Sequence, residues 1–322
     1  MKAEEILISL MKGKCQMEAL EQINQKIEDF LEELESPIVL ELSSKIQKGK
    51  MLRSKLALNI ATESEECILL CAIIEMIQSA SLLHDDVIDN ATMRRSKPSI
   101  NAIAGDKNAI MLGDILYSKA FCELTQFQEN FPMIPRIVAN AVTTLAIGEM
   151  EDVELAKQFN ANEAKYLTMV EHKTASLIES TAYAAAFLSG RNQEEAKSFR
   201  IYGRNLGIAF QIIDDVLDIV SSTQTLGKPA LSDFKEGKTT LPYIYLYHSL
   251  NTIDKKRLEN AFGKELEQKE QDWILENLKA SGAIQKSIDL AKHLGEVGIE
   301  AISNHSCDKL IKIMQEMINR DF

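Results

Sequence analysis

Proline and glycine, the residues that most often interrupt secondary structure, are scarce in this sequence. The 322 residues include six prolines and 14 glycines, which nowhere form a rich stretch. Alanine, leucine, isoleucine, glutamate and lysine recur instead with helical spacing. No composition shift marks a linker between two halves of the chain. We therefore expect an all-α fold in a single domain, residues 1–322.

An excess of basic residues is also missing. The chain has 36 lysines and arginines against 48 aspartates and glutamates, a formal net charge of −12. Proteins that bind nucleic acid usually carry a basic face that neutralises phosphates. The composition therefore argues against a nucleic-acid partner.

Long apolar runs and cysteine motifs are absent too. Residues 1–14 carry Glu4 and Glu5 and lack the apolar core and cleavage site of a signal peptide. No run approaches eighteen apolar residues, so we expect no transmembrane segment. The five cysteines are odd in number and lack zinc-site spacing, which is typical of buried thiols in a reducing compartment. We expect a cytoplasmic protein.

The sequence does contain one design twice, an apolar helix that ends in acidic residues. Residues 67–89 read CILLCAIIEMIQSASLLHDDVID, apolar on nearly all sides until the acidic end, and 207–220 read GIAFQIIDDVLDIV. We expect these two buried helices at about 66–89 and 199–220. Further helices are expected near 101–127, 135–157 and 162–188, with shorter amphipathic ones beyond Pro242.

Each acidic end has the pattern D-D-x-x-D. Asp85 and Asp89, like Asp214 and Asp218, are four residues apart and share a helix face. Like charges at this spacing, near a helix C-terminus, are unfavourable unless something positive is held there. Hard carboxylate oxygens suit Mg²⁺, which also takes substrate phosphates as ligands. The alternative, a solvated acidic helix end, is disfavoured because the pattern occurs twice on the same kind of helix.

Cations at loop-like positions accompany both clusters. Two arginines follow the first cluster, two lysines follow the second, and a basic stretch precedes the first buried helix. A lysine and a threonine also stand inside an otherwise apolar helical stretch. Taken singly, each cation reads as a solvated surface charge, but their shared position favours binding of diphosphate charge. These residues are Arg94 and Arg95, Lys228 and Lys238, Lys50 and Arg53, and Lys173 with Thr174.

Together these motifs resemble those of trans-type polyprenyl diphosphate synthases, the family that includes farnesyl, geranylgeranyl and octaprenyl diphosphate synthases. The resemblance covers about residues 49–242. LLHDDVIDNATMRRSKPS resembles the family's first aspartate-rich motif, and FQIIDDVLDI with the following GK…D…GK-T-TLP resembles the second. It implies an isoprenoid-synthase bundle of about ten or more helices around a deep central cavity, acting as a homodimer.

The resemblance also implies roles for individual residues. Asp85 and Asp89, with Asp214 across the cavity, would ligate three Mg²⁺ ions on the allylic diphosphate. The supporting acids would be Asp86, Asp215 and Asp218. The allylic diphosphate itself would be held by Arg94, Lys173, Thr174, Gln211, Lys228 and Lys238. Isopentenyl diphosphate would be held by Gly49, Lys50, Arg53, Gln78 and Arg95.

The implied reaction ionises the C–O bond of the allylic diphosphate and joins its carbon to the double bond of isopentenyl diphosphate. A proton is then lost to the released diphosphate, so no side-chain nucleophile is needed. His84, beside the aspartates, is expected to pack or to support them rather than to act as a base.

Product length is expected to depend on side-chain size before Asp85. Short-chain members block the tunnel with an aromatic residue four or five positions earlier, where this chain has the small Ser81 and Ala80. Ile77 and Ile74 are deeper candidate walls, and the floor is expected near Val138 or Val142. We therefore expect a long-chain product, octaprenyl or close to it, made from farnesyl diphosphate for a quinone side chain. Membrane contact is expected only transiently, for product release.

Four alternatives differ in what they require. A short-chain farnesyl or geranylgeranyl synthase shares both motifs and differs in tunnel depth. A terpene cyclase usually carries an Asn/Ser/Glu metal motif in place of 214–218. A non-catalytic regulatory subunit would be expected to have lost one motif, and a purely structural bundle needs neither opposed acids nor matched cations.

Overall fold

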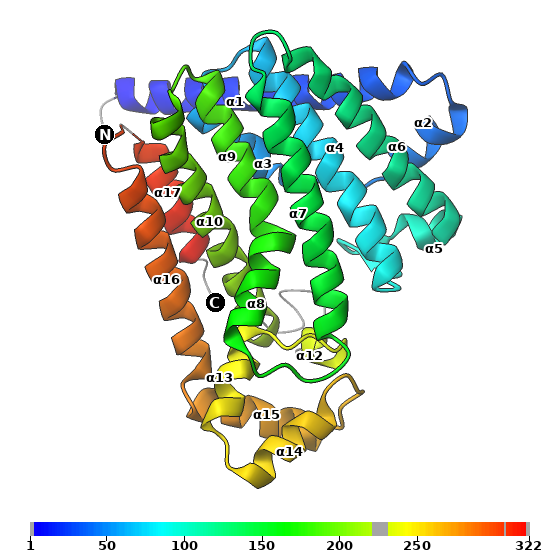
Figure 1. Cartoon of the computed structure of the whole chain (residues 1–322), viewed down its shortest axis with the longest axis vertical. Coiled ribbons are helices and arrows are strands. Elements are labelled where there is room, and N and C mark those ends of the chain that lie inside the picture. The colour runs from blue at the N-terminus through cyan, green and yellow to red at the C-terminus, as the bar shows by residue number, and fades with distance from the viewer. Residues whose placement is uncertain (1–2, 221–230, 306, 320–322) are drawn as a thin grey trace. The chain divides into compact units, whose positions relative to one another are not determined.

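The structure, a computed structural model, describes residues 3–220, 231–305 and 307–319, with side chains from residue 17 onward. Within these ranges the secondary structure is helical apart from one two-stranded antiparallel sheet, β1 (Met93–Arg94) paired with β2 (Lys97–Pro98). Figure 1 labels the helices in chain order. The all-α prediction is confirmed.

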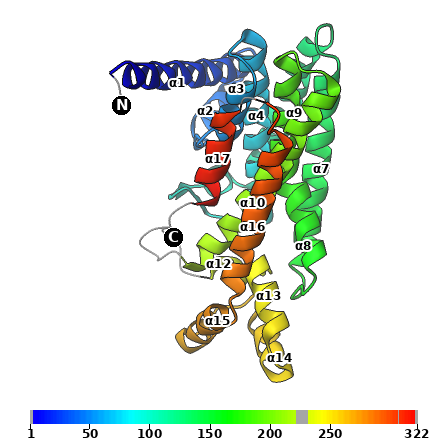
Figure 2. The ribbon, with the colours of Figure 1, turned by 90° about the vertical axis from the view of Figure 1, so that its left-hand side faces the viewer.

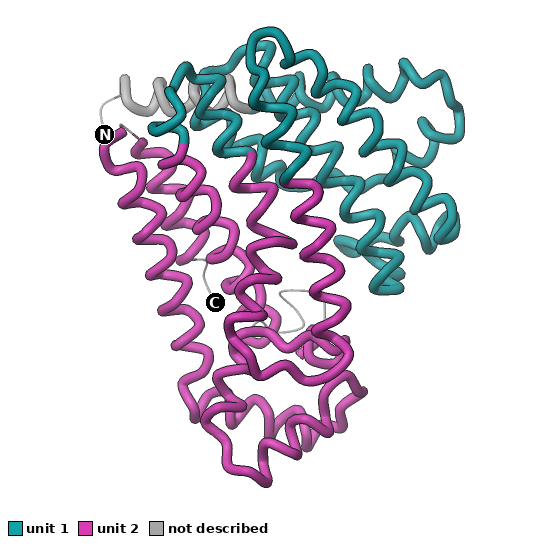
Figure 3. The backbone as a smooth tube through the Cα atoms, viewed as in Figure 1, with its two compact units in different colours: residues 1–140, 181–196 teal, residues 141–180, 197–322 magenta. Residues whose placement is uncertain are grey.

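The chain divides into two compact units (Figure 3). Unit 1 comprises residues 1–140 and 181–196, and unit 2 comprises residues 141–180 and 197–322. Helices α7 (Met133–Leu155), α9 (Ser176–Leu188) and α10 (Gln193–Val220) each begin in one unit and end in the other. The single domain over residues 1–322 stays a prediction.

Unit 1 is built around α4 (Glu65–Ile88), which packs against α1, α3, α5 and α6. Ser64 caps this helix by accepting a hydrogen bond from the backbone N–H of Cys67, and Glu65 and Glu66 complement the positive end of the helix dipole. Its middle is apolar all round, as a helix surrounded by others requires. The other helices of the unit are α1 (Ala3–Glu32), α2 (Pro37–Ser44), α3 (Leu52–Ile60), α5 (Ile100–Ala104), α6 (Asp106–Leu124) and the short η1 (Thr125–Phe127).

Helix α4 is also long and apolar enough to cross a membrane, by length and composition alone. A count of uninterrupted apolar runs in the sequence does not single out this helix, because Glu75 and Gln78 interrupt its apolar residues. Of its most apolar window, 72% is buried inside the protein. The core helix of a soluble protein passes the same test, so this one helix is weak evidence for a membrane span.

Unit 2 contains the second acidic helix, α10, and most of the C-terminal helices. Within it α16 packs along α13, α15 and α17, as Figure 1 and Figure 2 both show. The remaining helices of the unit are α8 (Glu163–Val170), η2 (Glu171–Ala175), α12 (Ser232–Lys235), α13 (Leu241–Ser249), α14 (Thr252–Ala261), α15 (Gln268–Ala280), α16 (Ala283–Ala301) and α17 (Asp308–Ile318).

Helix boundaries differ from the predictions at defined places. The helix expected at 101–127 is broken by Gly105, whose φ of 85° ends α5 and precedes α6. The helix expected at 162–188 is continuous but includes the π-helical turn η2. The N-terminal segment that contains Glu4 and Glu5 is part of a single helix, α1, which continues to Glu32.

Candidate active site

The first acidic cluster lies at the end of α4. Asp85 and Asp86 stand in its last turn, and Asp89 is its C-cap. Asp86 is only 3% exposed, and Arg94 donates a hydrogen bond from Nε to its Oδ1 at 2.8 Å. Nη2 of Arg94 forms an ion pair with the same oxygen at 2.8 Å. Burial raises the pKa of Asp86, and the charge and hydrogen bond of Arg94 oppose that rise. Asp86 therefore anchors the β1–β2 turn to α4, a contact that the sequence did not reveal.

Gly49 and Arg95, two residues predicted to hold isopentenyl diphosphate, lie next to each other in unit 1. Arg95 donates from Nη1 to the carbonyl of Gln47 at 2.9 Å, which brings its guanidinium over Gly49. A Cβ atom at position 49 would lie 2.9 Å from Nη2 of Arg95, closer than such contacts normally come. Lys50 is exposed beside them. The structure thus joins Gly49, Lys50 and Arg95 across 46 residues of chain.

Arg53 does not lie in a break, as the sequence suggested, but in the first turn of α3. Burial lowers its pKa to about 10, while the carboxylate of Glu75 on α4 raises it. Its Nε is buried with no hydrogen-bond partner among the described residues. A buried donor of this kind costs free energy unless something accepts from it. Gln78, half-buried on α4, accepts a hydrogen bond at its carbonyl from the hydroxyl of Ser81.

The second acidic cluster is on α10, and Asp215 is its most buried member, 4% exposed. Its carboxylate accepts hydrogen bonds from the hydroxyl of Tyr166 and from Nε2 of Gln211, the latter at 2.8 Å. The hydroxyl of Thr174 donates in turn to Oε1 of Gln211 at 3.0 Å. Burial, with the nearby charge of Asp233, raises the pKa of Asp215 well above its usual range.

These side chains line a cavity of about 210 Å³ within unit 2. It collects predicted residues that are spread over 66 positions of sequence. They are Lys173, Thr174, Gln211, Asp214, Asp215 and Lys238. Asp218 lies beside it and accepts from the backbone N–H of Asp233 at 3.3 Å. Lys228 lies outside the described residues.

Lys173 sits in the π-helical turn η2, a rare geometry that is frequent at functional sites. Its ammonium donates to Oδ2 of Asp152 at 2.6 Å and lies 2.9 Å from Oε2 of Glu149. Both acids come from α7, which can approach the turn only because residue 148 is glycine: a Cβ there would lie 2.2 Å from the backbone nitrogen of Lys173. Prediction missed Glu149 and Asp152, although their acidic segment, GEMEDVE, stands out in the sequence.

The carboxylates fit a divalent cation that is shared with a substrate. No group of three or more His, Cys, Asp or Glu among the described residues could hold a metal by itself. Mg²⁺ needs no such group, because it binds through one or two carboxylates, substrate phosphates and waters. The pairs Asp85 with Asp89 and Asp214 with Asp218 each stand at a four-residue spacing on one helix. Asp85, Asp89 and Asp214 as ligands stay a prediction.

The residues expected to set product length are all buried. Ile77 and Ala80 are fully buried on α4, and Ser81 is 9% exposed. Ile74, Val138 and Val142 are buried as well. Their role as tunnel walls and floor stays a prediction.

His84, next to Asp85, packs against α6. Its Nε2 lies 3.2 Å from the carbonyl oxygen of Ile110 and 3.4 Å from Oδ1 of Asp114. A Cβ at Gly113 would collide with the imidazole ring at 2.3 Å. The contacts of His84 are therefore those of a packing side chain.

Comparison with known proteins identifies this arrangement. The family model described as polyprenyl synthetase matches residues 37–278. The chain is 32% identical to an octaprenyl diphosphate synthase of Haemophilus influenzae over 88% of this chain and 87% of that one. It is 34% identical to a short chain isoprenyl diphosphate synthase of Methanocaldococcus jannaschii over 67% of each chain.

Solved structures agree with the family match. The octaprenyl pyrophosphate synthase of Helicobacter pylori superposes with a TM-score of 0.89 at 44% identity, covering 94% of this chain and 99% of that one. A polyprenyl synthase of Caulobacter crescentus, solved with calcium and isoprenyl diphosphate, gives a TM-score of 0.84 at 28% identity over 95% and 94% of the two chains. The fold is thus the all-α isoprenoid-synthase fold. The chain belongs to the polyprenyl synthetase family and is a trans-prenyltransferase.

Proposed function

We propose that this enzyme condenses isopentenyl diphosphate with farnesyl diphosphate to make a long-chain all-trans polyprenyl diphosphate, octaprenyl, for a quinone side chain. The observation that carries this proposal is the similarity to octaprenyl synthases over nearly the whole of both chains. The small residues Ala80 and Ser81 before Asp85 support it.

The proposed roles divide the site residues between the two substrates. Lys173, Thr174, Gln211 and Lys238, with Arg94 and Lys228, hold the allylic diphosphate, and their charges and donors stabilise the oxygens that receive the C–O bonding electrons. Mg²⁺, held by Asp85, Asp89 and Asp214 as three ions, supplies further neutralisation of that leaving group when bound.

Isopentenyl diphosphate is held by Gly49, Lys50, Arg53, Gln78 and Arg95. Its double bond supplies the electron pair of the new C–C bond, and the proton lost afterwards goes to the released diphosphate. The position of the Arg95 guanidinium beside Gly49 supports this assignment, because a guanidinium pairs with diphosphate oxygens. Apolar side chains such as Ile77 and Ala80 exclude water that would quench the allylic cation.

The oligomeric state and the cellular location of the protein form part of the proposal. We propose a homodimer in the cytoplasm that contacts a membrane only to release its product. The apolar chain of that product favours a lipid environment over water.

A short-chain product is the second candidate, favoured by the similarity to the Methanocaldococcus enzyme. A radiolabelled isopentenyl diphosphate assay with farnesyl diphosphate as primer separates the two. Chain-length analysis should give products of about eight isoprene units. Products that stop at C15 or C20 would support the second candidate, and no condensation would sink both.

A further inference from the structure

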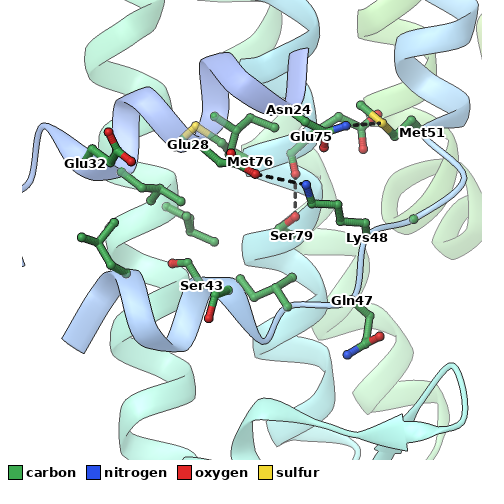
Figure 4. A pocket seen from close by; sticks show the side chains of 17 residues that line it. Asn24, Glu28, Glu32, Ser43, Gln47, Lys48, Met51, Glu75, Met76 and Ser79 are labelled. Atoms are coloured by element: carbon green, nitrogen blue, oxygen red, sulfur yellow. Dashed lines mark hydrogen bonds and ion pairs between the residues drawn. The ribbon is translucent and has the colours of Figure 1, made fainter. Parts of the chain in front are cut away.

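Glu75 is an acidic residue in the apolar middle of α4, and the proposed chemistry gives it no role. Residues 67–74 before it are all buried, whereas Glu75 is half-buried and lines a cavity of about 470 Å³ between α1 and α2 (Figure 4). A carboxylate in such surroundings costs free energy unless hydrogen bonds or an opposite charge compensate it. The partners of Glu75 therefore indicate what it does.

These partners belong to the beginning of α3. Oε1 of Glu75 accepts hydrogen bonds from the hydroxyl of Ser54 at 2.6 Å and from its backbone N–H at 3.3 Å. The thiol of Cys71, one turn earlier on α4, donates a weaker hydrogen bond to the carbonyl of Ser54 at 3.8 Å. Ser54 is fully buried, so α4 contacts its hydroxyl, its N–H and its carbonyl.

Helix α3 depends on these contacts because its own sequence supplies no cap. Met51, the residue before the helix, has a φ of 49°, and within the residues that the structure describes its side chain caps no backbone group. A residue at this position usually has extended backbone and a side-chain oxygen that accepts from the first turn. Glu75 provides that oxygen from another helix, and its charge complements the positive end of the α3 dipole.

Arg53 stands in this same first turn, directly before Ser54. Burial lowers the pKa of Arg53 to about 10, and the carboxylate of Glu75 is the charge that raises it. Glu75 thus acts on the turn twice, through its hydrogen bonds to Ser54 and through its attraction for Arg53. A neutral acceptor such as glutamine could replace only the first of these two interactions.

From these contacts we propose that Glu75 is a positioning residue for isopentenyl diphosphate, an inference that rests on the proposed role of Arg53. Glu75 fixes the first turn of α3 and orients the guanidinium of Arg53 for the diphosphate. It does not contact the substrate itself, because a carboxylate repels a diphosphate. Its effect is therefore confined to isopentenyl diphosphate and does not extend to the allylic substrate.

The charge is tested with Glu75→Gln, which keeps an oxygen for Ser54 and removes the attraction for Arg53. The KM for isopentenyl diphosphate should rise about tenfold, while kcat and the KM for the allylic substrate change less than about twofold. Glu66→Gln is the matched control, because it removes the same charge from an exposed position of α4. An unchanged KM for isopentenyl diphosphate in Glu75→Gln, or an equal rise in Glu66→Gln, overturns the proposal.

Action through Arg53 is tested by a double-mutant cycle. In the background of Arg53→Gln, the second change Glu75→Gln should raise the KM for isopentenyl diphosphate less than about twofold, because the side chain that it orients is gone. A full tenfold rise in that background would show that Glu75 does not act through Arg53, and the proposal would fail.

A loss of stability alone is distinguished by a variant at the other end of α4. Ser64→Ala removes the cap of that helix, so it should lower the melting temperature and leave the KM for isopentenyl diphosphate unchanged. If Ser64→Ala raised this KM as much as Glu75→Gln does, the effect of Glu75 would be one of stability and the positioning role would be wrong.

Calorimetric titration of the full chain with isopentenyl diphosphate, in the absence of an allylic substrate, measures affinity independently of turnover. Glu75→Gln should bind about tenfold more weakly than the wild type. In a chain without condensation activity, this difference would leave the positioning role standing while the proposed function falls. Equal affinities of the wild type and Glu75→Gln would overturn the positioning role, whatever the turnover.

Discussion

At the scale of single residues, the aspartates within each acidic cluster differ in their surroundings. Asp86 and Asp215, the second aspartate of each D-D-x-x-D pattern, are buried and hydrogen-bonded to neighbours. Their raised pKa values reflect that burial. Asp86 and Asp215 therefore join each helix end to neighbouring side chains, and the role of Asp85, Asp89 and Asp214 as metal ligands stays a prediction.

We expect Asp85→Ala or Asp214→Ala to lower turnover roughly 10³-fold, because several kcal/mol of leaving-group stabilisation is lost with the metal. The fold should survive, since removing one acid relieves repulsion at the i, i+4 spacing. Steady-state kinetics and circular dichroism measure the two effects. Glu129→Ala, at an exposed position outside both clusters, is the control. Near-normal turnover in either aspartate variant would contradict the assignment, and EDTA should silence the wild type until Mg²⁺ is restored.

Gly49→Ala should raise the KM for isopentenyl diphosphate about tenfold, with little change in the KM for the allylic substrate. The new methyl group would lie 2.9 Å from the guanidinium of Arg95 and displace it. Lys45→Ala, at a partly exposed position in the same segment whose ammonium pairs with Glu41, is the control. Lys173→Ala should show the opposite preference, and the reverse of either pattern would mean that the two diphosphate sites are exchanged.

At the scale of elements, the π-helical turn η2 depends on α7. Gly148 allows the backbone of α7 to approach Lys173, and Asp152 and Glu149 then hold its ammonium. Arg204 of α10 donates to the carboxylate of Glu171 at the beginning of the same turn. The turn is thus fixed from two helices of unit 2.

Gly148→Ala should cost about 1–3 kcal/mol of stability, because a Cβ at this position overlaps the backbone of the turn. It should also weaken use of the allylic substrate, since Lys173 moves with η2. Chemical denaturation and substrate KM values measure both effects. Ile147→Ala, 46% exposed on the same helix, should change neither. An unaltered KM for the allylic substrate in Gly148→Ala would show that Lys173 does not take part in binding that substrate.

At the scale of the whole molecule, the property at stake is the length of the product. Helix α4 carries the aspartates at its end and buries Ala80 about one turn and Ile77 about two turns before Asp85. One turn advances about 5.4 Å, roughly one isoprene unit. We therefore expect side-chain volume along this helix to set the length of the product.

Ala80→Phe or Ser81→Phe should shorten the product to about C15–C20 while condensation continues, because apolar volume is lost and the acidic cluster is untouched. Product analysis by reversed-phase chromatography measures the length. Ser79→Phe is the matched control, since Ser79 lines a different cavity, between α1 and α2 of unit 1. An unchanged length in Ala80→Phe would disprove the tunnel, even with the reaction class intact.

Local patterns in the sequence were sufficient for the helical fold and for the two acidic clusters, whereas the substrate roles of individual residues came from the resemblance to a known family. Helical periodicity, the scarcity of proline and glycine, and the repeated D-D-x-x-D depend on near neighbours, so they can be read without tertiary contacts. Thr174 and Gln211 were both among the residues predicted for the allylic diphosphate, and the structure joins them by a hydrogen bond. Gly49 and Arg95 were both among those predicted for isopentenyl diphosphate, and the structure brings them together as well.

Only the tertiary structure decided which of these side chains contact other side chains of the same chain. Three such interactions join residues that are 8 to 24 positions apart in the sequence. They are the ion pair of Arg94 with Asp86, the burial of Arg53 beside Glu75, and the contacts of Lys173 with Asp152 and Glu149. The cavity between α1 and α2 is likewise enclosed only when α1, α2, α4, α6 and the segment 45–51 come together. Such features follow from distances and solvent exclusion in the folded chain, which no local sequence pattern encodes.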